Sequence, residues 1–246
     1  MLRRLDRQDE NNEPETFGVP NYQRVRDAIR ADIARGTLAS SARLKISELS
    51  ARYGLSPAPI REALNQLAAE GWVVINPNRG AQVRAIDETF FREMNEIRVA
   101  LESYTVGLCA AAATSSDVDR LEAIEDEYEA TLAKLTPGSG GGESTRGVEA
   151  AALVRINARL HAAIRALHPN RETEILINRY AGFFNTMRVA WGYGSRRPQQ
   201  MAEEHRELLA AFRAKNPAAA EPICRRHIGH AMEDLLAVWR RGHAGP

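Results

Sequence analysis

The chain has 246 residues, of which 44% are hydrophobic and 26% charged, as in soluble globular proteins with room for two domains. No apolar run is long enough to cross a bilayer, and the N-terminus lacks the apolar core of a signal peptide, so we expect a cytoplasmic protein with no membrane partner. The two cysteines, Cys109 and Cys224, form no Cys-x-x-Cys pair, which indicates buried free thiols.

The net charge of +1 hides an uneven distribution. Between Pro20 and Arg84, ten Lys and Arg residues face five acids, a net charge of +5, so the rest of the chain carries −4. A basic module joined to a mildly acidic body is typical of a DNA-binding domain attached to a second domain.

The chain starts with a polar tail and one helix. Residues 1–18 are rich in Asp, Glu, Asn and Arg, which predicts a disordered tail. Val25, Ile29 and Ile33 then recur at helical spacing, so a helix is expected over 21–35.

Two short helices joined by a tight turn follow. The first places Ile46, Leu49 and Tyr53 on one face and ends at Gly54, where left-handed backbone geometry costs little. A helix, a short turn containing glycine and a second helix form a DNA-binding arrangement, in which the second helix enters the major groove.

The second helix of this pair is expected to begin at Pro57, with Ser56 as its N-cap. Its inward face is apolar and consists of Ile60, Leu64 and Leu67. Its outward face is small or polar and consists of Ala58, Arg61 and Asn65. Arg and Asn are well shaped for bidentate contact with guanine and adenine edges, so this face is expected to read DNA bases.

A β-hairpin is expected next. Residues 72–75 are β-branched or aromatic, 76–80 form a turn cluster, and 81–84 continue as a second strand. This hairpin would be a wing with Arg79 at its tip. Arg79 and Lys45 are expected to contact phosphates or the minor groove.

Long helices account for the rest of the chain. Apolar spacing predicts six of them, at 87–113, 116–135, 147–167, 171–191, 198–215 and 218–241. Asp87 and Ser116 are the expected N-caps of the first two. The first should bury an apolar stripe made of Phe90, Met94, Ile97, Leu101 and Leu108. Residues 136–142 are glycine-rich and are expected to be a flexible connection within the bundle.

The predicted fold is therefore mainly α. An N-terminal winged helix-turn-helix, with three helices and a β-hairpin wing, is joined to an all-α antiparallel helical bundle. The expected domain limits are 19–85 for the first and 86–246 for the second.

The segment LSPAPIREALNQLAAEGWVVINPNRGAQV, residues 55–83, resembles the winged helix-turn-helix of GntR-type bacterial transcription regulators. The resemblance implies binding to double-stranded DNA at a palindromic operator. The residues expected at the DNA are Arg61, Asn65, Arg79, Lys45, Ser56 and Ala58. The family's arginine after the serine is commonly a DNA contact but is Pro57 here, so the half-site is expected to differ from the family's usual one.

The C-terminal part resembles the FCD effector domain in the FadR branch of these regulators. The matching pieces are short but agree in order and spacing, at 96–102, 157–161, 204–211 and 227–228. The resemblance implies a homodimer whose helical domain senses a small ligand. Six helices rather than seven would place the chain nearer the VanR-like subgroup.

Three histidines and one asparagine form the strongest candidate site. Asn157 and His161 share a helix face, while His205 and His227 lie on the last two predicted helices and can point into the same core. Three imidazoles and an oxygen suit zinc, nickel or manganese, although ordinary surface histidines could show the same spacing. The FCD resemblance favours a divalent metal.

Metal-binding members of that family usually carry Asp where this chain has Asn157. The amide should weaken metal binding and strengthen the attraction for an anionic ligand, because it leaves the ion's charge uncompensated. Arg98 is the candidate for binding the effector's carboxylate, and its alternative partner is Glu102 one turn later. His230 is expected near the pocket but outside the ligand set, and His168 at a helix end.

These features predict a transcription regulator rather than an enzyme, with an operator affinity that responds to a small organic acid. The alternative is a metalloenzyme that carries a nucleic-acid-binding module, but the sequence places no base or nucleophile for it and has no His-Glu-x-x-His motif. A DNA-bound scaffold with a vestigial pocket is a third hypothesis, which applies if Asn157 abolishes metal binding.

Overall fold

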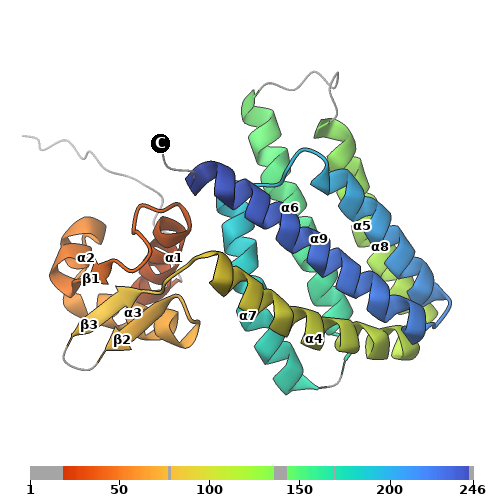
Figure 1. Cartoon of the computed structure of the whole chain (residues 1–246), viewed down its shortest axis with the longest axis horizontal. Helices are drawn as coiled ribbons and strands as arrows, with labels where there is room; N and C mark the ends of the chain where they lie inside the picture. Colours follow the sequence, from red (N-terminus) through yellow and green to blue (C-terminus); the bar gives the residue numbers. More distant parts are fainter. Residues whose placement is uncertain (1–18, 77–78, 136–142, 169, 244–246) are drawn as a thin grey trace, which may run out of the picture. The chain divides into compact units, whose positions relative to one another are not determined.

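The computed structural model describes residues 19–76, 79–135, 143–168 and 170–243 (Figure 1). Its contacts divide these residues into two compact units, one of 19–30 and Arg43–Val83, the other of Ala31–Ala42 and 84–243. The predicted disordered tail and the predicted glycine-rich connection lie outside the described residues. No helix among the described residues is both long and apolar enough to span a membrane.

Three short helices form most of the first unit: α1 (Asn21–Ala34), α2 (Ile46–Tyr53) and α3 (Pro57–Ala69). The predicted apolar stripes of α1 and α3 are confirmed, since Val25, Ile29, Ile60, Leu64 and Leu67 are buried. In the predicted stripe of α2, Leu49 is buried, while Ile46 and Tyr53 are half-buried. Gly54 ends α2 in the left-handed region, at φ +66°, as its position predicts. Ser56 occupies the N-cap position of α3, but its side chain makes no capping hydrogen bond.

The wing is a three-stranded antiparallel sheet in the order β1-β3-β2. The predicted hairpin consists of β2 (Val73–Asn76) and β3 (Gly80–Val83), with Val73 opposite Val83. The sequence did not predict β1 (Arg43–Leu44), which pairs with Gln82 and Ala81 of β3. Leu44 is buried, so this two-residue strand fixes the chain before α2 against the sheet.

Six helices, as predicted, make up most of the described residues of the second unit. They are α4 (Glu88–Ala112), α5 (Ser115–Leu135), α6 (Glu143–Arg165), α7 (Arg171–Trp191), α8 (Arg197–Arg213) and α9 (Pro217–His243). Helix α4 packs along α9, and α5 packs along α6 and α8 (Figure 1). Cys109 and Cys224 lie in the core between these helices as buried free thiols, as expected.

The structure confirms one predicted helix cap and corrects the other. The Asp87 carboxylate accepts a hydrogen bond from the Phe90 backbone N–H at 2.8 Å. The prediction for Ser116 was wrong. Helix α5 begins one residue earlier, and Thr114 caps it, because its hydroxyl accepts from the Asp117 N–H while the Asp117 carboxylate accepts from the Thr114 N–H.

The predicted apolar stripe of α4 was also partly wrong. Ile97 and Leu108 are 41% and 39% exposed, and Tyr104 on the same face is 62% exposed. The face of α4 that turns inward over its second half is instead mixed, with Glu102, Ser103, Thr105, Val106, Cys109 and Ala110 buried. Helix α4 therefore presents both polar and apolar groups to the bundle interior, and it leaves three large apolar side chains exposed on one face.

Candidate functional site

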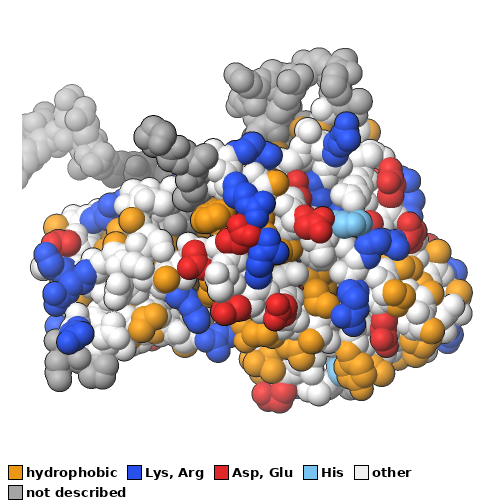
Figure 2. Space-filling model, in the orientation of Figure 1, with side chains coloured by type: hydrophobic (Ala, Val, Ile, Leu, Met, Phe, Trp, Pro, Cys, Tyr) orange, Lys and Arg blue, Asp and Glu red, His pale blue; other side chains and the backbone are white. Residues whose placement is uncertain are grey.

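The face of α3 that is expected to read DNA is exposed. Ala58, Arg61 and Asn65 all point to the outside of the first unit. Arg61 and Asn65 line a groove of about 430 Å³ between α2, α3 and the sheet. Lys45 lines the same groove and also pairs with Glu48 at 2.6 Å. Lys and Arg side chains are visible over α2 and the nearby sheet (Figure 2).

The groove does not contain every residue expected at the DNA. Ser56, Ala58 and Arg79 are exposed but do not line it. Arg43, which the sequence analysis did not select, is exposed at one wall. A two-residue strand has no periodicity in sequence, so nothing marked Arg43 as a neighbour of Arg61.

Three helices bring the predicted histidines together. His161 comes from α6, His205 from α8 and His227 from α9, and each offers a ring nitrogen within 4.8 Å of the others. The Nε2 atoms of His161 and His227 are 3.1 Å apart. His205 and His227 are 1% and 5% exposed, so they are not surface histidines. This cluster could hold a metal ion.

Two unpaired buried atoms test whether the site fits a metal. His205 Nε2 and Asn157 Oδ1 are both buried, and neither has a hydrogen-bond partner among the described residues. Leaving such an atom unpaired in a protein interior is costly, and nearly all buried polar atoms have a partner. A divalent cation would accept a lone pair from each, so the residues present fit the metal that the FCD resemblance implies.

Buried carboxylates orient two of the histidines. Glu125 Oε2 lies 2.7 Å from Nδ1 of His205, and Glu204 Oε2 lies 2.7 Å from Nδ1 of His227. A carboxylate holds the imidazole proton on Nδ1, which leaves the Nε2 lone pair available for a cation. Neither glutamate was predicted. Glu204 directly precedes His205, but Glu125 lies 80 residues before its partner and no sequence spacing connects them.

The surroundings favour neutral imidazoles. Burial lowers the pKa of His161 and His227 well below the ordinary value, and the neighbouring imidazoles lower it further. Burial also raises the pKa of Glu125, although its hydrogen bond from His205 opposes that shift. Because their pKa values are lowered, His161 and His227 are neutral at neutral pH. Neutral imidazole is the form that binds a metal.

Glu204 is the centre of a buried hydrogen-bond network. Arg197, which is 2% exposed, donates to the Glu204 carboxylate at 2.9 Å. His230 also contacts Glu204 and not the three-histidine cluster, which is consistent with its expected place outside the ligand set. His168 lies at the end of α6, where its Nδ1 accepts from the Asn170 N–H, also outside the cluster.

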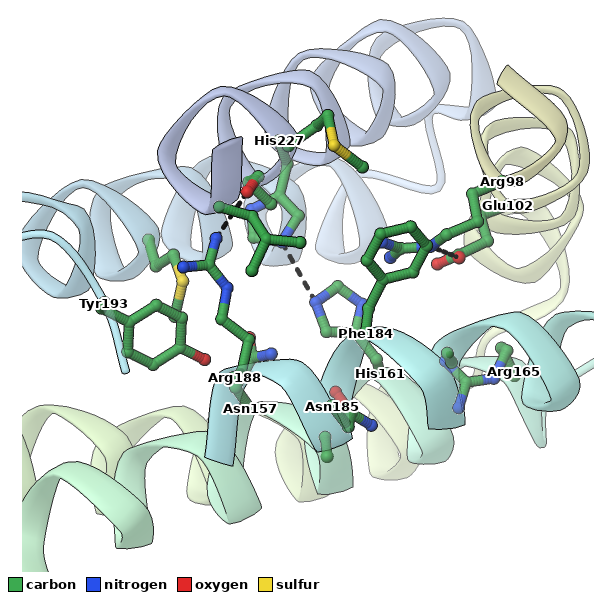
Figure 3. Close-up of a pocket in the computed structure, with 16 residues that line it drawn as sticks. Arg98, Glu102, Asn157, His161, Arg165, Phe184, Asn185, Arg188, Tyr193 and His227 are labelled. Carbon is green, nitrogen blue, oxygen red and sulfur yellow. Dashed lines mark hydrogen bonds and ion pairs between the residues drawn. The ribbon is translucent and has the colours of Figure 1, made fainter. Parts of the chain in front are cut away.

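Arginines surround the small cavity next to the histidines. The cavity has a volume of about 50 Å³, and its lining includes Asn157, His161 and His227. Arg98, Arg165 and Arg188 also line it, whereas Glu102 is the one acid among the described lining residues. Tyr193 lies at one end of the cavity in Figure 3, and Arg98, Glu102 and Arg165 lie at the other. This excess of guanidinium groups suits an anion.

Arg98 lines the cavity and pairs with Glu102, its alternative partner in the sequence analysis. Its Nε donates to Glu102 at 2.7 Å, and its guanidinium lies 4.5 Å from the centre of the Phe184 ring. The pair with Glu102 is not on the surface, because the two side chains are 14% and 4% exposed. Arg98 is therefore held in a fixed position at the cavity wall.

Comparisons with known proteins agree with this architecture. The family described as bacterial regulatory proteins, gntR family, matches residues 21–83, and the FCD domain matches residues 93–230. A Bacillus subtilis protein named as an HTH-type transcriptional regulator, YdhC, is 24% identical over 224 residues, which are 91% of this chain and 95% of that protein.

Two further similarities extend over most of the chain. A probable D-xylose utilization operon transcriptional repressor of Paenarthrobacter nicotinovorans is 29% identical over 206 residues, 83% of this chain and 84% of the relative. The solved structure of E. coli McbR/YncC shares the fold with a TM-score of 0.61 at 20% identity, over 90% of this chain and 100% of that one. The relatives from B. subtilis and P. nicotinovorans are both named as transcription regulators.

Proposed function

Because the chain belongs to the gntR family of bacterial regulatory proteins and carries an FCD domain, it is a DNA-binding transcription regulator, and we propose that a small organic acid bound at a divalent metal controls its operator affinity. The observation that carries the proposal is the buried three-histidine cluster with its unpaired His205 Nε2 and Asn157 Oδ1, next to a cavity lined by arginines. Residues 19–85 bind DNA in this proposal, and residues 86–246 sense the ligand and form the dimer.

The proposed DNA contacts follow the groove of the first unit. Arg61 and Asn65 read base edges in the major groove of a palindromic operator. Lys45 and Arg79 contact phosphates or the minor groove, and Ser56 and Ala58 lie against the DNA at the start of α3. The operator also places the protein in the cytoplasm, where bacterial DNA lies.

The proposed metal ligands are Nε2 of His161, His205 and His227 and Oδ1 of Asn157. None of these ligands would bring a negative charge to a bound zinc, nickel or manganese ion, so the ion would keep its double positive charge for a carboxylate. Arg98 lines the same cavity and is already fixed by Glu102, so it can bind the acid without reorganising.

The proposed homodimer has a surface that fits it. Ile97, Tyr104 and Leu108 follow one another at i, i+7 and i+11, so they form one exposed apolar face of α4. Helix α7 adds exposed apolar side chains, namely Ile175, Leu176 and Val189. Hydrophobic side chains are visible over α4 and α7 in Figure 2. A second copy of the chain would cover these side chains and present two wings to the two half-sites of an operator.

Operator binding with and without metal tests the proposed function. An operator can be selected from random DNA by the full-length protein, and its affinity measured by fluorescence anisotropy across a panel of organic acids. After dialysis against a chelator and after adding back zinc, nickel or manganese, at least one acid should change the affinity about tenfold to hundredfold in the metal-loaded protein alone, or about 1.4–2.7 kcal/mol. An affinity that no acid changes in either state would contradict the proposal and favour the scaffold hypothesis.

A further inference from the structure

A second and larger cavity shares a wall with the arginine-lined cavity. It has a volume of about 300 Å³ and lies between the end of α5, the first half of α6 and the segment that joins α7 to α8. Its lining includes apolar side chains from both helices and from the start of α8, namely Leu132, Leu135, Ala150, Leu153 and Pro198. No charged side chain is among its described lining residues.

Tyr193 forms the shared wall. It lines both cavities, and its ring packs against the core cluster that contains Leu153 and Met201. The Arg188 guanidinium lies 4.7 Å from the centre of the ring. Figure 3 shows Tyr193 and Arg188 together at the end of the cavity opposite Arg98.

The segment around Tyr193 is anchored to α9. Arg188 donates to the Asp234 carboxylate at 2.6 Å and to the Gly192 carbonyl at 3.1 Å. The backbone N–H of Gly194 donates to the same Asp234 at 3.1 Å. Tyr193 is therefore held between two anchored glycines, and the larger cavity is a built feature of the bundle.

The two cavities differ in volume and in the charge of the side chains that line them. A space of about 50 Å³ holds a few atoms, and its lining combines three arginines with polar and apolar side chains, so it suits a carboxylate. A space of about 300 Å³ lies at the lower end of the range for ligand pockets. Its lining is uncharged and more apolar than polar, although it includes Ser195 and Gln199, and this suits a hydrocarbon chain.

We propose that the effector is a monocarboxylic acid with an apolar chain, and that the chain passes Tyr193 into the larger cavity while the carboxylate stays at the histidine and arginine end. This inference rests on the proposed function, because it assumes that an acid binds in the first cavity. A short sugar acid or hydroxy acid has no group that the larger cavity would bind.

A series of straight-chain acids from acetate to octanoate tests the inference. Their dissociation constants are measured by calorimetry on the metal-loaded full-length protein. Affinity should rise about fourfold with each methylene once the chain reaches the apolar cavity, since burying a methylene from water is worth about 0.8 kcal/mol. An equal affinity for every member of the series would overturn the inference.

Variants that fill the larger cavity provide a second test of the inference. Ala150→Phe places a ring in it from α6 and should abolish the rise with chain length while leaving acetate affinity unchanged. Ala151→Phe is the matched control, because its neighbouring half-buried position does not line the cavity. Ser195→Phe fills the same cavity from an exposed position and replaces Ala150→Phe if that variant does not fold. A rise with chain length that survives the filling variant would show that the chain lies elsewhere.

The two proposals fail in different ways. If acetate binds in a metal-dependent way but longer acids bind no better, the proposed function stands and the inference about the chain is wrong. If no acid of the series binds and a panel of other anions also leaves operator affinity unchanged, both are wrong.

Discussion

At the scale of single residues, Arg61 is the side chain on which the proposed base contacts depend most. It is exposed on α3 beside Asn65 and lines the groove with Lys45. Arg61→Ala should weaken operator binding by about 1–3 kcal/mol and relax the sequence preference at one base pair. Binding is measured by anisotropy on operator variants at moderate salt. Arg120→Ala, an exposed arginine of α5, is the control, and an unchanged affinity in Arg61→Ala would rule out the docking proposed here.

The buried histidines make a prediction about acid stability. The pKa values of His161 and His227 in the folded chain lie well below the unfolded value of about 6.5. The unfolded chain therefore takes up protons first as pH falls, so the free energy of unfolding of the metal-free protein should decrease from about pH 6.5 down to the folded pKa values. Urea unfolding across this range measures the effect, and His161→Gln should reduce it. A slope that His161→Gln leaves unchanged would show that other groups cause it.

At the scale of elements, the exposed face of α4 predicts how the chain associates. Tyr104→Arg places a charge at its most exposed apolar position and should dissociate the dimer, because burying an unpaired charge in an interface is costly. Ala130→Arg adds the same charge at an exposed position of α5 and should remain dimeric. Analytical ultracentrifugation separates the two states. A Tyr104→Arg variant that sediments as the dimer would place the interface elsewhere.

Helix spacing made the elements of the bundle predictable, and tertiary packing explains what the sequence missed. All six helices of the second unit follow from runs of apolar residues at helical spacing. The predicted burial of Ile97 and Leu108 failed because periodicity shows that a helix has an apolar face but not whether that face turns toward the core or the outside. Strand β1 has two residues, too few for a pattern.

In the candidate site, too, the spacing of residues along the helices was predictable and the packing between helices was not. Histidine spacing together with the FCD resemblance predicted that His161, His205 and His227 meet, and the helices that carry them follow in the predicted order. The pairing of Glu125 with His205 joins α5 to α8 and depends on how two helices pack, which no local pattern records. The place of Tyr193 beside both cavities appears only in the folded chain.

At the scale of the whole molecule, the proposed signal is a change in the helix that follows the wing. Helix α4 begins a few residues after β3 and carries Arg98, while the proposed metal ligands lie on α6, α8 and α9. An acid that binds both the ion and Arg98 would connect these four helices. The acid can shift the balance between two arrangements of α4 only to the extent that it binds one of them more tightly than the other.

The central claim is that the histidine cluster holds the ion to which the acid binds, and metal analysis with calorimetry on four proteins tests it most directly. Wild type and His168→Ala should retain a divalent metal, and His205→Ala should lose it. Asn157→Asp should bind the metal more tightly and the acid more weakly, because a carboxylate neutralises part of the ion's charge. Equal metal content and equal acid affinity in all four proteins would contradict the account.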